Sequence, residues 1–401
     1  MVISNQVLRL SWFLVPAAAL LAANLSANAA IYTYKDANGN TVYSDQPPPG
    51  ASTTTTGGST TPSTTSSYST IIQKELMPAV DVSKNMVPVT GYSTLLIKNT
   101  GEFPVAGSGD FRIDCKPSHM NNDDPIVFPN QKNAAPHHTY FGNSSVNAQS
   151  DINNLANIGN STCRGGIANR SAYWVPSMID TSSKAALVPD LGLWYYKSGL
   201  VGYTDPVNSH ILPPPKALKL IAGNPKAKSE AEAHNISYIC RSATGQVLGK
   251  AYPTQVLKQI PACPQGGTII ASVSFPQCWD GKNLDSADHI SHMSYDLVKT
   301  ASSRNGQFIW KYSCPATHPV AIPAIGLHVY YKVTSAEGTK NWRLSSDNYQ
   351  KTDYNSGYSM HGGWVNGWDE KVIQGVVSNC VTKAVNCGNH KLGDGRVIYK
   401  Q

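Results

Sequence analysis

The sequence lacks the short motifs that mark several large enzyme classes. It contains no Gly-x-Ser-x-Gly turn for a serine nucleophile, no Gly-x-x-x-x-Gly-Lys phosphate loop and no His-Glu-x-x-His zinc motif. No Cys-x-x-Cys pair occurs either, which argues against a thiol-redox site or a zinc ribbon. Any chemistry must therefore come from side chains that the fold brings together.

Charged residues are scarce, at 14% of the chain, although Lys and Arg outnumber Asp and Glu and give a formal net charge of +7. The basic residues are scattered, and no basic run is interleaved with aromatic residues. Because nucleic-acid binding depends on such clustered positive charge, we expect no nucleic-acid partner. A mild, non-specific affinity for anionic polymers is compatible with the charge.

Long apolar runs are missing beyond residue 30. Residues 10–23 form an apolar run after Arg9, and Ala27-Asn28-Ala29 supplies the small-x-small pattern of a signal-peptidase site. This pattern predicts a signal peptide over residues 1–30 and a secreted or periplasmic protein, with an uncleaved N-terminal anchor as the alternative. No later stretch approaches the ~18 apolar residues of a membrane helix, so we expect no transmembrane segment after cleavage.

Cysteine usage agrees with export. All eight cysteines follow the predicted signal peptide, and an even number in an oxidising compartment favours up to four disulfide bonds. The sequence does not choose among the 105 ways to pair eight cysteines. Cys380 and Cys387 are close enough in sequence to be the first expected pair.

The region before the main domain divides into two parts. In residues 31–50, two short β-favouring runs flank Asn38-Gly39, a strong hairpin signal because both residues tolerate positive φ. This stretch resembles the small DUF4124 module of exported bacterial proteins. Residues 51–70 are almost entirely Thr, Ser and Gly, which predicts a flexible linker.

Residues 71–401 are long enough to form one large domain with its own core. Short β-favouring runs separated by Gly, Pro, Asn and Asp clusters predict a mainly β, antiparallel sandwich-like fold with long loops and few helices. The clearest runs are residues 93–98, 217–221, 236–240, 268–275, 308–312 and 327–334. One helix is predicted over residues 370–381, with Asp369 as its N-cap.

Four segments are dense in His, Asp and aromatic residues. They are residues 124–129 with 136–143, residues 275–295, residues 314–320 and residues 357–369. Together, and most specifically through Cys-Trp-Asp-Gly-Lys-Asn at 278–283, they resemble the DUF1996 family of exported proteins. The resemblance implies a domain often joined to carbohydrate-binding modules, but it transfers no activity. Where the family carries His-x-His, this chain has Pro136, then His137 and the matching His138, which departs from a two-histidine pattern.

The segment at residues 275–295 is chemically the richest. Asp280, Lys282, Asp288, His289 and His292 supply both proton acceptors and donors within thirteen residues, as general acid–base catalysis requires. Two other interpretations stay open. Asp285, His289 and His292 could instead bind a metal ion, and the whole segment could be a structural polar loop whose side chains satisfy the backbone.

The remaining candidates carry a similar ambiguity. His318 lies in a loop held by a cysteine and prolines, and His361 precedes two glycines, where a backbone can approach a ligand closely. Each could equally be a buried histidine bonded to the backbone. Candidate substrate-binding residues are Tyr140, Trp279, Asn283, Tyr295 and Trp364. For the tryptophans, a place in the core is the commoner alternative to sugar stacking.

These observations favour an exported carbohydrate-active protein that cleaves an extracellular or cell-wall polysaccharide by His/Asp acid–base chemistry, as a hydrolase or a lyase. No cofactor is expected, although a divalent metal could bind. A non-catalytic polysaccharide- or matrix-binding protein is the alternative, and a metal-dependent oxidase is the third. The hypothesis requires one cleft lined by His138, Asp280, Lys282, Asp288, His289, His292, His318 and His361.

Overall fold

The computed structural model describes residues 32–35, 41–44, 81, 84, 88–204, 210–248, 256–347, 356–388 and 390–400. The predicted signal peptide and the predicted linker lie outside these residues. The N-terminal strands β1 (Tyr32–Lys35) and β2 (Thr41–Ser44) pair antiparallel, and the predicted Asn38-Gly39 turn lies outside the described residues.

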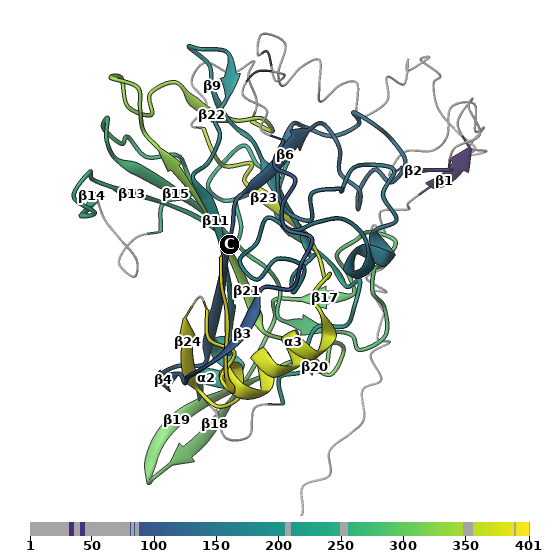
Figure 1. The fold of residues 1–401 in the computed structure, drawn as a ribbon, viewed down its shortest axis with the longest axis vertical. Helices are drawn as coiled ribbons and strands as arrows, with labels where there is room; N and C mark the ends of the chain where they lie inside the picture. The colour runs from purple at the N-terminus through teal and green to yellow at the C-terminus, as the bar shows by residue number, and fades with distance from the viewer. Residues whose placement is uncertain are drawn as a thin grey trace, which may run out of the picture.

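Two sheets form the body of the domain (Figure 1). The larger sheet has the order β14 (Val247–Leu248), β13 (Ile236–Arg241), β15 (Thr268–Ser274), β21 (Ala324–Lys332), β11 (Leu191–Lys197), β5 (Asp110–Cys115), β24 (Val385–Gly388) and β4 (Val105–Ala106). The smaller sheet has the order β12 (Lys219–Gly223), β23 (His361–Val365), β8 (Ala172–Pro176), β7 (His138–Gly142) and β6 (Pro117–Asn121). All of these pairs are antiparallel except β24 with β5.

Shorter elements surround this body. Small sheets are formed by β17 (Met293–Ser294), β16 (Cys278–Trp279) and β20 (Val320–Ala321), by β10 (Ala185–Ala186), β9 (Met178–Asp180) and β22 (Trp342–Leu344), and by β25 (Gly395–Ile398) with β3 (Ile97–Glu102). The hairpin of β18 (Val298–Arg304) and β19 (Gln307–Ser313) projects from the domain in Figure 1. The helices are η1 (Ile152–Asn157), α2 (Gly199–Thr204), α3 (Glu370–Val376) and the π-helix η2 (Val377–Val381). The predicted mainly antiparallel β class with few helices is confirmed.

The main core lies between the two sheets. In β11, buried and partly exposed positions alternate, so Trp194 and Tyr196 point toward the smaller sheet. Trp194 packs against Phe141 and Tyr173, with ring centroids 5.1 and 4.3 Å apart. The hydroxyls of Tyr173 and Tyr196 lie 2.8 Å apart, so a hydrogen bond also links the sheets. Because the facing side chains of the two sheets pack against each other, the sheets form a sandwich.

The smaller sheet is buried on its outer face as well. Every residue of β7, β8 and β23 is buried, without the alternation of a sheet that faces water on one side. The residues that cover this outer face come largely from the loops between 122 and 158, and form a second apolar cluster with the sheet: Ile126, Tyr140, Val146, Ile152, Leu155, Ala172, Trp174 and Val365. This covered face positions the candidate site.

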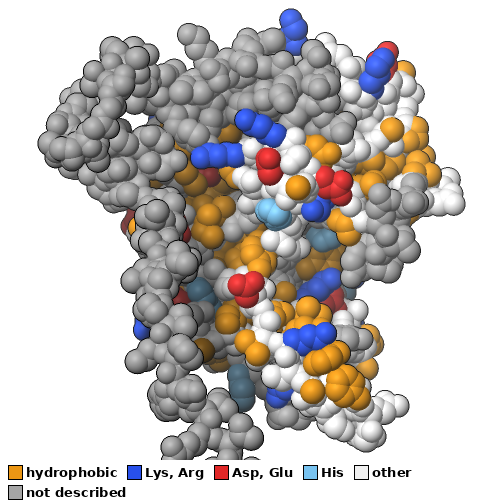
Figure 2. Space-filling view, turned by 180° about the vertical axis from the view of Figure 1, so that it is seen from behind, with side chains coloured by type: hydrophobic (Ala, Val, Ile, Leu, Met, Phe, Trp, Pro, Cys, Tyr) orange, Lys and Arg blue, Asp and Glu red, His pale blue; other side chains and the backbone are white. Residues whose placement is uncertain are grey.

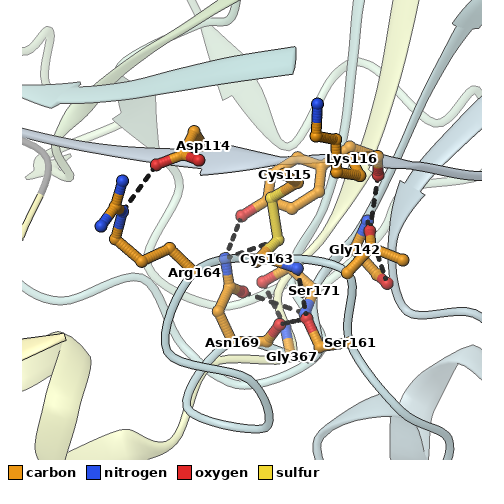
Figure 3. Close-up of a disulfide and its surroundings, with 12 residues drawn as sticks. Asp114, Cys115, Lys116, Gly142, Ser161, Cys163, Arg164, Asn169, Ser171 and Gly367 are labelled. Carbon is orange, nitrogen blue, oxygen red and sulfur yellow. Dashed lines mark hydrogen bonds and ion pairs between the residues drawn. A yellow bond between two sulfur atoms is a disulfide. The ribbon is translucent and has the colours of Figure 1, made fainter. Parts of the chain in front are cut away.

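All eight cysteines form disulfides, as the even count predicted. The pairs are Cys115–Cys163, Cys240–Cys263, Cys278–Cys314 and Cys380–Cys387, and the last was the pair expected first. Cys115–Cys163 links β5 to the loop that precedes β8, beside an ion pair of 2.7 Å between Asp114 and Arg164 (Figure 3). These bonds constrain loops that would otherwise be long and unpaired.

The predicted helix and its cap are confirmed. Asp369 accepts a hydrogen bond from the backbone N–H of Val372 at 3.0 Å, and α3 continues into η2 up to Val381. The face formed by Val372, Ile373, Val376, Val377 and Cys380 is buried. An amphipathic stretch with an aspartate cap was therefore sufficient to locate this element.

The surface agrees with the charge pattern of the sequence. Lys and Arg side chains are scattered over the face in Figure 2 and do not gather into one patch. Within the described residues, no helix has the length and hydropathy needed to cross a membrane.

Candidate active site

A pocket of about 630 Å³ opens on the outer side of the smaller sheet. Its walls come from the loop after β6, from the loop after β7 and the start of η1, from the first residue of β12 and from the polar segment 275–295. The lining residues are Pro125, Ile126, Pro129, Asn130, Ala148, Gln149, Ser150, Asp151, Ile152, Asn153, Lys219, Asp285, Ser286, Ala287 and His289. A volume of this size suits a small ligand or a short piece of a polymer.

Three of the lining residues form a charged group. Asp285 Oδ1 accepts a hydrogen bond from His289 Nδ1 at 2.9 Å, and Asp285 Oδ2 lies 3.4 Å from Lys219 Nζ. Lys219 Nζ also donates to Asn153 Oδ1 at 3.1 Å. The side chains of His289 and Asp285 are 17% and 26% exposed, so a ligand in the pocket can reach them. We refer to Lys219, Asp285 and His289 as the pocket triad.

The electrostatics of the triad keep Asp285 ionised. Burial raises the pKa of Asp285, but the hydrogen bond from His289 and the nearby Lys219 ammonium outweigh burial and leave that pKa below its ordinary value. An ionised Asp285 accepts the Nδ1 proton of His289 and so fixes the tautomer in which Nε2 carries a lone pair. His289 Nε2 makes no hydrogen bond to any described residue. The arrangement is that of an imidazole base oriented by a carboxylate.

His289 also has an uncommon backbone conformation. Its φ of +58° lies in the left-handed region, which few residues other than Gly adopt, although Asn, Asp and His do so more often than the rest. The turn is held because the backbone N–H of His289 donates to Ser286 O at 2.9 Å. Strained backbone of this kind is concentrated at functional sites, where it aims a side chain.

Two other residues of the segment hold the loop. His292 is 1% exposed, with Nδ1 2.9 Å from Ser286 Oγ and Nε2 2.7 Å from Lys219 O. Asp288 accepts hydrogen bonds from the backbone of Ile290 and Ser291 and from Ser286 Oγ, and despite some desolvation these bonds lower its pKa well below the ordinary value. Both residues behave as the structural alternative predicted, because their polar atoms satisfy the loop itself.

Asp280, Lys282 and Asn283 form a turn at the other end of the segment. Asp280 Oδ1 accepts from the backbone of Lys282 and Asn283, and Oδ2 accepts from the Asn283 side chain at 2.6 Å. Trp279 Nε1 donates to Asn283 O. His318 Nε2 lies 2.9 Å from Ser291 O, which ties the next loop to this segment. These five residues do not line the pocket.

The predicted sugar-stacking residues lie elsewhere. Tyr140 and Trp364 are fully buried in the two cores, which is a correction because a buried ring has no face for a ligand. Tyr295 is 43% exposed but its hydroxyl donates to Ser274 O at 2.7 Å, away from the pocket lining. The commoner alternative, a place in the core, holds for Trp364.

His138 and His361 meet in the interior instead of the pocket. Their Nε2 atoms are 3.0 Å apart, and the residues are 1% and 5% exposed. Burial lowers the pKa of each to about 4. Asp124, whose pKa is raised by burial, accepts from Trp174 Nε1 at 3.1 Å and interacts electrostatically with His361. Segments 124–143 and 357–369 therefore do converge, but behind the pocket wall.

The expected single cleft is thus not formed, because only His289 of the eight predicted catalytic residues lines the pocket. The predicted metal set of Asp285, His289 and His292 does not form either, since both ring nitrogens of His292 are occupied. Across the described ranges no group of three or more His, Cys, Asp or Glu side chains is placed to hold a metal ion.

Sequence reasoning missed Lys219 and Asn153. Lys219 precedes an apolar run in β12, where a lysine at the start of a strand gives no signal of its own. Asn153 lies in η1, whose N-cap Asp151 is an ordinary capping residue. Only the pairing of β12 with β23, and the packing of the 275–295 loop against β12, bring these residues to His289.

Comparisons with known proteins identify the family but no activity. No curated protein and no solved structure matches the chain. The family described as domain of unknown function DUF4124 matches residues 18–70, which include the N-terminal hairpin. The family described as domain of unknown function DUF1996 matches residues 124–368, more than half of the chain and all of the pocket lining. The chain belongs to the DUF1996 family.

Proposed function

We propose that this protein is an exported lyase that cleaves a uronate-containing polysaccharide by β-elimination in the pocket. The observation that carries the proposal is the pocket triad: an imidazole oriented by Asp285 at 2.9 Å, with the Lys219 ammonium beside the same carboxylate. A base and a fixed cation within one pocket are what removal of a proton next to a carboxylate requires.

The reaction follows from these positions. His289 Nε2 takes the proton from C5 of a uronate ring, and Lys219 stabilises the negative charge that develops on the ring carboxylate. The C4–O bond then breaks, a C4=C5 double bond forms, and the imidazolium returns its proton to the departing oxygen. One imidazole therefore serves as base and then as acid, so no second titrating group is needed.

Elimination is favoured over hydrolysis by the state of the carboxylates. A glycoside hydrolase of the usual kind needs one carboxyl group kept protonated as an acid. In this pocket the pKa of Asp285 is lowered, despite burial, by its contacts with His289 and Lys219. The other lining carboxylate, Asp151, caps η1 by accepting from Asn153 N. Neither is placed to donate a proton to a leaving group.

Export and an anionic substrate are supported by features outside the pocket. Four disulfide bonds suit folding outside the cytoplasm, in agreement with the predicted signal peptide. The net charge of +7 favours an anionic partner over a neutral one.

The test is an elimination assay on a panel of uronate polysaccharides, read as ultraviolet absorbance of the conjugated double bond. The variant is His289→Asn, because Asn tolerates positive φ and keeps the backbone while removing the ring. We expect its rate to fall by a factor of about 10² to 10⁴, with at most a small fall in Tm from loss of the hydrogen bond to Asp285. His234→Asn, at an exposed histidine outside the pocket lining, is the matched control and should keep the wild-type rate.

Three results would contradict the proposal. Binding of the polysaccharide without any unsaturated product would make the protein a binding module, the main alternative. New reducing ends without unsaturation would make it a hydrolase. An undiminished rate in His289→Asn would remove the pocket triad from the reaction.

A further inference from the structure

The histidine pair behind the pocket wall has an unusual arrangement of protons. His138 Nδ1 lies 2.8 Å from Asp123 O, and His361 Nδ1 lies 2.8 Å from Ser359 O. A carbonyl oxygen only accepts, so each Nδ1 carries the hydrogen and donates it. In the neutral imidazoles each Nε2 then bears a lone pair, and the two lone pairs face each other across 3.0 Å.

Such a contact is repulsive unless a cation lies between the two nitrogens. The ring centroids are 5.3 Å apart, nearly as far as an Nε2–Nε2 distance of 3.0 Å allows, so the lone pairs point along one line. Anchoring of Nδ1–H by a carbonyl oxygen is also the usual support for a histidine that binds a metal through Nε2. The pair is therefore set for a cation that takes two ligands in a line.

The register of β7, β8 and β23 places the two rings opposite each other. His138 of β7 pairs with Pro176 of β8, and the register of β8 with β23, continued by two residues, puts His361 opposite the same proline. The two histidines therefore flank Pro176 across the sheet. On the far side Gly223 pairs with His361 at a φ of +80°, where an added Cβ would lie 2.3 Å from Met360 O.

The number of ligands narrows the choice of cation. Asp124 is the carboxylate that interacts with His361, and both of its oxygens are occupied by backbone N–H groups and by Trp174. His138 interacts in the same way with the buried Asp123, so two carboxylates lie near the pair and the choice of cation rests on the number of ligands. Zn²⁺ in structural sites takes four ligands, and within the described part of the chain only two nitrogens converge here.

We propose that His138 and His361 bind one copper(I) ion between their Nε2 atoms. Imidazole is a good ligand for copper, and all eight cysteines are in disulfides, so no thiolate competes for the ion. Metal–nitrogen bonds of about 2.0 Å require the two nitrogens to separate to about 4 Å, through rotation of two side chains held from opposite strands. The bound ion would clamp β7 to β23 across β8. This site is independent of the pocket triad.

The experiment uses the purified protein, stripped of metal with a chelator and then given copper with ascorbate as reductant, with its disulfides intact. Native mass spectrometry counts copper per chain, and X-ray absorption reports the oxidation state and ligand number. We expect one two-coordinate Cu(I) in the wild type and none in His138→Gln or His361→Gln. Copper at a hundred times its Kd should also raise the wild-type Tm by about 5 °C.

His119→Gln is the matched control. His119 is a largely buried histidine on the neighbouring strand β6, and both of its ring nitrogens are bonded, to Ser118 Oγ and Val146 O. It should bind copper as the wild type does, even if it unfolds at a lower temperature. Copper retained by the His138 and His361 variants would overturn the proposal. Absence of uptake by the wild type would also overturn it and would leave a shared proton as the cation between the rings.

Discussion

Replacement of Asp285 by Asn tests how the pocket triad works, because it keeps the shape of the side chain and removes its charge. The amide oxygen can still accept from His289 Nδ1, but Lys219 Nζ loses the negative charge 3.4 Å away. The amide can also turn its NH₂ group toward His289 and so favour the wrong tautomer. We therefore expect the elimination rate to fall by a factor of about 10² to 10⁴, comparable to loss of the base itself.

The same substitution should also lower the free energy of unfolding. In Asp285→Asn the hydrogen bond from His289 no longer reaches a carboxylate and Lys219, which is 11% exposed, loses its ion-pair partner; a charge-assisted hydrogen bond contributes roughly 1.5–3 kcal/mol, so we expect a loss of about 2 kcal/mol in the free energy of unfolding at pH 7. Because the folded-state pKa of Asp285 is depressed, its contribution is complete above the ordinary pKa of 3.8 and is lost as the pH falls below it. The gap between wild type and variant should narrow in urea titrations below that pH.

Asp296→Asn is the control, since Asp296 is an exposed carboxylate just beyond the polar segment and outside the pocket lining. It should leave rate and stability within error of the wild type. The reasoning is refuted if Asp285→Asn keeps more than half of the wild-type rate, or if the control loses as much activity as the variant does.

Three further predictions concern residues that hold the fold. His292→Ala should lower the free energy of unfolding by about 2–4 kcal/mol in urea titrations, because it removes two buried hydrogen bonds, to Ser286 Oγ and Lys219 O, and empties the space of the ring; an unchanged midpoint would contradict its structural role. Asp114→Asn should cost about 1.5–3 kcal/mol at pH 7, and since the ion pairs of Asp114 lower its pKa despite burial, this cost should shrink below pH 3.8; a gap that is constant with pH would refute it. Removing the disulfide with a sequence separation of 48 by replacing Cys115 and Cys163 with Ala should cost about 4 kcal/mol, against about 2.4 kcal/mol for the C-terminal disulfide with a separation of 7; equal losses by calorimetry would contradict the loop-entropy argument.

Much of the fold could be predicted because its signals are local. The helix at Glu370–Val376 shows an aspartate cap and an apolar face, and the disulfide Cys380–Cys387 joins neighbours in sequence. Strands β7, β8 and β23 were harder to predict, because they are buried on both faces and so lack the alternation that reveals a strand at the surface.

The site was harder to predict because it depends on contacts between distant segments. The sequence singled out the segment 275–295, part of which lines the pocket, but its polar residues look alike in sequence. Only the structure shows that His289 faces the pocket while His292, three residues later, is sealed against Lys219 O. Likewise, the meeting of His138 and His361 follows from the order of β7, β8 and β23, which no local pattern encodes.

The central claim is that a uronate ring binds in the pocket against Lys219 and His289. The most direct test is a crystal structure of the slow variant His289→Asn with a uronate oligosaccharide bound. The account predicts a ring carboxylate within hydrogen-bond distance of Lys219 Nζ, and C5–H directed at residue 289. A saccharide bound on another face, or a pocket left without sugar while the wild type still degrades the polymer, would contradict it.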